Sequence, residues 1–214
     1  MTADITRWVA EKLAEDRNVE VVSHTPEGFL VVRSQTGYTF LVAVISVPTL
    51  IECTHVAPLF LGAIKPQLVV NVPSRAMWSG DAIHHIHDQG AAFGTFGDIA
   101  RAADSQAAGE FRNKNMDFFL KSMRQHTNVV GVSYVSESVF RANRRRGDDV
   151  TVAVIDAYNM SAEDVRNARD RLGGFDVIVK SSSYGKITTA AQQAAGDMGA
   201  EALTFRELMQ RLAR

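Results

Sequence analysis

The sequence predicts an α/β protein made of two tandem copies of one α-β-β-β-α-β-α unit, over residues 1–107 and 108–214. Strand-length apolar runs alternate along the whole chain with stretches of helical periodicity. Segment 68–103 also aligns with 177–212 at a constant offset of 109, without a gap and with eight identical positions. Because the identities include a turn glycine and helix-start residues as well as apolar positions, we interpret the pattern as an internal duplication.

The first half is expected to contain helices and strands over 5–17, 19–23, 29–34, 38–46, 49–63, 67–72, 79–89, 91–96 and 97–104. Ile5, Trp8, Val9 and Leu13 place one apolar face on the first helix. The second and third strands are expected to form a hairpin. Segment 49–63 is apolar on nearly all sides, which predicts a buried helix, although its internal proline should cut or kink it.

The second half is expected to repeat this order, with helices and strands over 113–127, 128–136, 161–172, 175–181, 188–198, 200–205 and 206–214. Residues 139–156 are expected to form a hairpin, or a long loop that enters a strand over 149–156. Ser161 and Asp164 are spaced like a capping box and predict a helix start. Gly173 predicts the end of the same helix.

The two halves differ in charge, although the whole chain has a net charge of −1. Residues 1–107 hold 7 Lys and Arg against 11 Asp and Glu, whereas residues 108–214 hold 16 against 13. The second half is therefore the expected partner for a polyanion. A single cysteine and an N-terminal segment unlike a signal peptide favour a cytoplasmic protein. The longest apolar run, 40–45, is too short to cross a membrane.

The segment 175–212, FDVIVKSSSYGKITTAAQQAAGDMGAEALTFRELMQRL, carries a family resemblance. It resembles the C-terminal part of Mrr-type domains of the restriction-endonuclease-like, or PD-(D/E)xK, superfamily. In those domains a strand leads through a Ser/Gly loop to a helix, a glycine, a short strand and a closing helix. The order of elements in each half is similar to that of the same fold.

The resemblance implies metal-dependent nuclease chemistry, which needs a carboxylate on the second strand and an acid-x-Lys on the third. The third strand of the first half, 40–45, has no ionisable residue, so that half is expected to be inactive. In the second half, Glu137 and Asp149 are weak candidates for catalytic metal ligands. The lysine position is occupied there by Thr151, which favours a pseudo-nuclease over an enzyme.

Basic residues in the second half form two candidate nucleic-acid contacts. The candidates are Arg141, Arg144, Arg145 and Arg146 of a hairpin, together with Lys180 and Lys186 around the loop SSSYG. Arginines at a hairpin tip can contact phosphates, and a serine-rich loop before a helix can bind an anion. A solvated charged loop and an ordinary helix cap are the alternative interpretations.

Histidines 84, 85 and 87 lie close together in the sequence, but their spacing matches no established zinc pattern. We therefore expect no metal site and no cofactor, with Mg²⁺ required only if the chain is a nuclease. Cys53 is expected to be a buried, unreactive thiol, because no basic group or helix start surrounds it.

Three functions remain open at this point. The first is a catalytically degenerate nuclease-like protein that binds DNA, RNA or a nucleic-acid-processing partner through its second half. The second is an assembly protein that oligomerises, or binds another protein, through its apolar first half. The third is a metal-dependent nuclease that uses Glu137 and Asp149.

Overall fold

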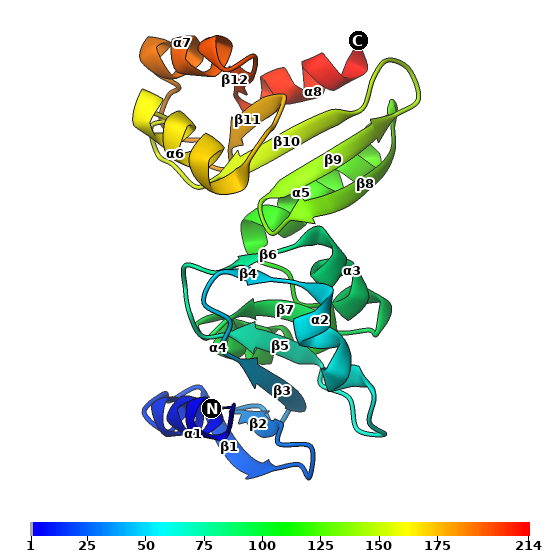
Figure 1. Cartoon of the computed structure of the whole chain (residues 1–214), viewed down its shortest axis with the longest axis vertical. Coiled ribbons are helices and arrows are strands. Elements are labelled where there is room, and N and C mark those ends of the chain that lie inside the picture. Colours follow the sequence, from blue (N-terminus) through cyan, green and yellow to red (C-terminus); the bar gives the residue numbers. More distant parts are fainter. Residues whose placement is uncertain (1) are drawn as a thin grey trace. The chain divides into compact units, whose positions relative to one another are not determined.

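The computed structural model describes residues 2–214, and it confirms a mixed α/β protein with eight α-helices and three sheets in that range (Figure 1). The chain divides into two compact units, Met1–Asn113 and Lys114–Arg214. The sequence-based boundary was placed between residues 107 and 108. The short 3-10 helix η2, Ala108–Glu110, belongs to the first unit because buried Ala108 and Phe111 join that unit's core.

The first unit is built on a five-stranded sheet in the order β1-β2-β3-β5-β7. The pairs β1–β2 and β2–β3 are antiparallel, whereas β5 and β7 run parallel to β3. The elements are α1 (Thr2–Leu13), β1 (Val19–His24), β2 (Leu30–Ser34), β3 (Thr39–Ile45), β4 (Leu50–Ile51), α2 (Cys53–Val56), η1 (Ala57–Phe60), β5 (Leu68–Asn71), β6 (Met77–Trp78), α3 (Gly80–Asp88), β7 (Ala92–Thr95) and α4 (Asp98–Ser105).

The second unit has a five-stranded sheet in the order β8-β9-β10-β11-β12, again with three antiparallel strands followed by two parallel ones. The elements are α5 (Lys114–Gln125), β8 (Val129–Ser136), β9 (Val139–Arg144), β10 (Val150–Ile155), α6 (Ala162–Leu172), β11 (Val177–Lys180), α7 (Thr189–Asp197), β12 (Glu201–Leu203) and α8 (Phe205–Ala213). Helices α5 and α8 pack on one face of this sheet, and α6 and α7 pack on the other.

The second face of that sheet is only partly covered. The hydrophobic cluster between this face and helices α6 and α7 contains Val139 of β9 and Ala153 of β10, but no residue of β8. The next outward positions on β9 and β10, Arg141 and Thr151, pair with each other outside this cluster. Strand β8 and most of β9 therefore present a face that the helices of this unit leave open, and β8 also exposes Val130 and Val135.

The predicted buried helix over 49–63 is wrong. That segment forms the short strand β4, the one-turn helix α2 and the 3-10 helix η1, which begins next to Pro58. Proline lacks an amide hydrogen and cannot continue an α-helix, so the chain tightens into η1 there. Leu61 beyond η1 is 85% exposed, and only Ile51, Val56 and Phe60 are buried in the segment.

Side-chain caps begin the helices of both units where the sequence predicts them. Ser79 caps α3 by accepting a hydrogen bond from the amide of Ala82, and Thr188 caps α7 in the same way from Ala191. Ser161 and Asp164 form the predicted capping box of α6. The predicted stop at Gly173 is also confirmed, since this residue is the C-cap of α6 with a positive φ of 80°.

A further capping box begins α8 and makes its stability sensitive to pH. The Thr204 hydroxyl and then the Thr204 amide donate to the Glu207 carboxylate, and these bonds lower the pKa of Glu207 below its ordinary value of 4.5. A depressed folded-state pKa stabilises the protein above the unfolded-state value, and this contribution disappears as the pH falls through the folded-state value.

We predict that Glu207→Gln lowers the free energy of unfolding at pH 7 by about 0.5 kcal/mol or less, because the side chain is largely solvated. Glutamine keeps an acceptor for Thr204 but carries no charge, so the difference from the natural protein should be smaller at pH 3 than at pH 7. Urea unfolding at both pH values measures it. A difference that does not change with pH would contradict this account of the cap.

Candidate functional site

The open face of the second sheet carries one of the predicted arginines at its centre. Arg141 lies on β9 between Ser133 of β8 and Thr151 of β10, and its side chain is exposed. Its neighbour Ala142 is buried against α5 and α8. Because side chains alternate along a strand, Arg141 projects from the opposite, open face.

The hairpin tip between β9 and β10 is ordered by hydrogen bonds within the tip. Arg144 Nε donates to the backbone oxygen of Asp148 at 2.6 Å, and the Asp149 carboxylate accepts from Asn143 Nδ2 at 2.7 Å. Gly147 has φ +80°, and a Cβ on it would lie 2.5 Å from the Arg144 guanidinium. Arg144 therefore closes the tip, and its Nε is committed to that turn.

Asn128 anchors the same tip to the rest of the unit. Its Nδ2 donates to the backbone oxygens of Arg146 at 3.0 Å and Leu212 at 2.8 Å, while its Oδ1 accepts from the Arg146 amide. The backbone is thus fixed, whereas the side chains of Arg145 and Arg146 are exposed. Neither guanidinium has a hydrogen bond or ion pair to any residue that the structure describes.

The two predicted lysines do not join the arginines. Lys180 is only 2% exposed, and its Nζ donates to three backbone oxygens, so it cannot contact an external phosphate. Lys186 is exposed, but it lies beyond the carboxyl end of β11, whereas the tip of the arginine hairpin lies at the amino end of β10. The structure therefore reduces the arginine site to Arg141, Arg145 and Arg146.

The two candidate catalytic carboxylates lie at opposite ends of β10. Glu137 precedes β9 and is paired with Arg171 of α6 at 3.0 Å, while Asp149 lies in the hairpin tip. The strand between them holds them roughly 15 Å apart. Two carboxylates that share a metal each lie within about 2.6 Å of it, so these two cannot do so.

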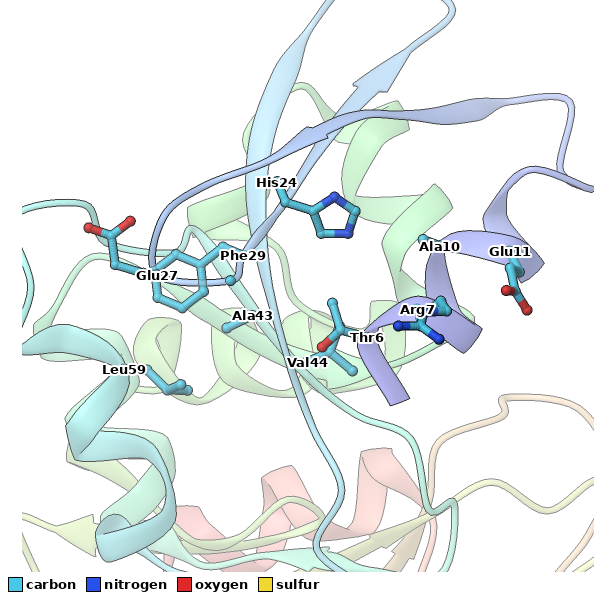
Figure 2. A pocket seen from close by; sticks show the side chains of 11 residues that line it. Thr6, Arg7, Ala10, Glu11, His24, Glu27, Phe29, Ala43, Val44 and Leu59 are labelled. Atoms are coloured by element: carbon cyan, nitrogen blue, oxygen red, sulfur yellow. The ribbon is translucent and has the colours of Figure 1, made fainter. Parts of the chain in front are cut away.

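Each unit has a cavity near the end of the third strand of its sheet and the turn before the second strand, walled chiefly by α1 in the first unit and by α6 in the second. In the first unit the cavity has a volume of about 620 Å³ (Figure 2). Its lining residues are Thr6, Arg7, Ala10, Glu11, His24, Glu27, Gly28, Phe29, Ala43, Val44 and Leu59. Figure 2 shows Arg7 and Glu11 at one side of the cavity and Glu27 and Leu59 at the other. An apolar floor with four charged or titratable groups at its rim can hold a small amphipathic molecule.

The cavity of the second unit is about 280 Å³ and more polar, with Asp156, Asp164, Asn167 and Arg171 among its lining residues. Neither Asp156 nor Glu27 was among the site residues predicted from the sequence. Glu27 and Glu137 each lie in the turn before the second strand of their sheet. An alignment of the hairpins, as well as of the helices, could have identified this shared position.

The histidines of α3 pack against aromatic rings. The His85 ring lies edge-on to Phe60 with a centroid distance of 5.7 Å, and the His87 ring lies 5.8 Å from Phe93. Over residues 2–214, no group of three or more His, Cys, Asp or Glu side chains could hold a metal ion. Cys53 is half-buried at the start of α2 rather than fully buried as expected.

A comparison with known protein families, curated proteins and solved structures finds no match to the chain. Within the described residues, no helix is long and apolar enough to cross a membrane.

The separation of Glu137 from Asp149 predicts that the two act independently. The changes in free energy of unfolding caused by Glu137→Gln and Asp149→Asn should add within about 0.5 kcal/mol in the double variant. Millimolar Mn²⁺ should not raise the melting temperature of any of these proteins. Stabilisation by Mn²⁺ that either substitution removes would show that the carboxylates share a metal.

Proposed function

We propose that the chain is a duplicated, catalytically degenerate nuclease-like protein that binds nucleic acid through the open β8–β9 face of its second unit. The duplication is supported by strand register as well as strand order. Val42 of β3 pairs with Leu68 of β5, and Val152 of β10 pairs with Val177 of β11. Val152 lies 110 residues after Val42, and Val177 lies 109 residues after Leu68, which is the offset of the sequence alignment.

A buried polar residue at the end of β5 and another at the end of β11 also support a common origin of the two units. Asn71 ends β5 and donates to the backbone oxygens of Val47 and Pro73. At the aligned position Lys180 ends β11 and donates to Tyr158 and Ser182. In both units the side chain therefore ties the loop after the third strand to the loop after the fourth.

Loss of catalysis is supported by the residues on the third strands. The inner positions of β3 and β10 are Val42, Ala43 and Val44 in one unit and Val152, Ala153 and Val154 in the other, and all six are buried. Neither strand offers the acid-x-Lys that the nuclease resemblance requires. A nuclease-like order of strands and helices that lacks the acid-x-Lys residues favours a role in binding over a role in catalysis.

The observation that supports nucleic-acid binding most directly is the set of exposed arginines on an ordered surface. Arg141 projects from the open sheet face, and Arg145 and Arg146 project from a tip whose backbone Asn128 holds in place. Guanidinium groups bind phosphates strongly, and a preordered backbone reduces the entropy lost on binding. The alternative of assembly through the first unit loses its main support, because segment 49–63 is not an apolar helix.

We predict that the protein binds a fluorescein-labelled 20-base-pair DNA duplex with an affinity that falls steeply between 50 and 200 mM NaCl. The double variant Arg141→Ala/Arg145→Ala should bind at least tenfold more weakly, and its salt slope should be lower by about two because two phosphate contacts are lost. Fluorescence anisotropy measures both quantities.

A matched control removes the same charge elsewhere in the unit. Arg166 of α6 and Arg206 of α8 are both exposed, and the double variant Arg166→Ala/Arg206→Ala should keep nearly the natural affinity. Equal losses in the two double variants would mean that net charge, and not the β8–β9 face, determines binding. Absence of salt-dependent binding would refute the proposed function.

A further inference from the structure

Two exposed tyrosines lie on neighbouring loops at the carboxyl end of the second unit's parallel strands. Tyr158 follows β10 and is 69% exposed, and Tyr184 follows β11 and is 74% exposed. Large aromatic side chains usually bury most of their surface, so two such rings in solvent on neighbouring loops are unusual for packing alone. Ligands of α/β sheets commonly bind at the carboxyl ends of parallel strands.

The buried Lys180 holds the backbones of both tyrosines. Its Nζ donates to the backbone oxygens of Tyr158 at 3.3 Å, Ser182 at 2.8 Å and Tyr184. An ammonium group has three donors, and all three are used here. Because one nitrogen binds both tyrosine oxygens, these oxygens lie within about 6 Å of each other.

Further contacts fix the two loops against each other. The Met160 amide donates to the Lys186 oxygen at 2.9 Å, and the Lys186 amide donates to Asn159 Oδ1 at 2.9 Å. Gly185 between them has φ +76°, and a Cβ there would lie 1.9 Å from the Tyr158 oxygen. Only glycine allows the loops to approach this closely, so the tyrosine backbones are preordered before any ligand arrives.

The first unit shows that one buried side chain can join the two loops without aromatic residues in them. Asn71 ties Val47 to Pro73 at the corresponding place, and neither residue is aromatic. The tyrosines of the second unit therefore contribute something other than the joining of the loops, and their exposure leaves the rings available to a ligand.

We propose that Tyr158 and Tyr184 form a stacking platform for unpaired bases of single-stranded nucleic acid, with Lys186 contacting a phosphate. Every base has a π face that an exposed aromatic ring can stack on, independently of sequence. Among the nearby charges, Asp156 and Lys186 are both exposed, and Asp156 accepts a hydrogen bond from Ser181. The exposed lysine and the excess of basic residues in this unit favour a polyanion over an uncharged sugar as the occupant.

This inference rests on the proposed nucleic-acid function but concerns a different surface from the arginine face. The test uses the full-length protein, a fluorescein-labelled ten-residue oligo(dT) and the labelled duplex described above. Tyr158→Ala and Tyr184→Ala should each weaken oligo(dT) binding about tenfold, since each removes one base–aromatic stack. Duplex binding should stay unchanged, because paired bases are not available for stacking.

Tyr158→Phe and Tyr184→Phe serve as matched controls, since they keep the stacking face and remove only the hydroxyl. Both should bind oligo(dT) almost as well as the natural protein. Gly185→Ala should weaken oligo(dT) binding although both tyrosines are present, because it separates the loops. Circular dichroism and the unchanged duplex affinity verify that each variant is folded.

The outcomes separate this inference from the proposed function. If the double alanine variant of the tyrosines binds oligo(dT) normally while Arg141→Ala/Arg145→Ala does not, the platform is refuted and the arginine face stands. Phenylalanine variants as weak as the alanine variants would also refute stacking. If neither the duplex nor oligo(dT) binds, both proposals fail together.

Discussion

Each unit depends on one parallel strand pairing, which is β3 with β5 in the first unit and β10 with β11 in the second. It joins an antiparallel hairpin to a strand–helix repeat, and its carboxyl end is where two loops leave the sheet together. Loop carbonyls that leave a sheet near a buried core need new donors, because an unsatisfied buried carbonyl costs about 1–3 kcal/mol. Asn71 supplies these donors in the first unit and Lys180 in the second, and both are 2% exposed.

The same arrangement determines which surfaces are left for binding. Because α6 and α7 cover the parallel half of the second sheet, the β8–β9 hairpin extends beyond them with one face open. Because the strands end together, the loops after β10 and β11 present Tyr158 and Tyr184 at one edge. The second unit thus offers two separate surfaces for the proposed ligands, one with exposed arginines and one with exposed tyrosines.

Local rules predicted most elements, and non-local contacts explain the errors. Helix starts at Ser79, Ser161 and Thr188 followed from capping chemistry, which depends on residues only three positions apart. The apolar composition of 49–63 suggested a helix, but Pro58 and the pairing of β4 with distant β6 determine its fold. Lys180 looked like a surface cation because its acceptors, the carbonyls of Tyr158 and of the following loop, come together only in the folded sheet.

The central claim is that nucleic acid lies on the second unit, and amide hydrogen exchange of the full-length protein tests it most directly. With saturating labelled DNA, protection is expected in 129–146, where β8, β9 and the arginine tip lie, and not around the cavity at Arg7 and His24 of the first unit. Protection confined to the first unit, or unchanged exchange throughout in the presence of bound DNA, would contradict it.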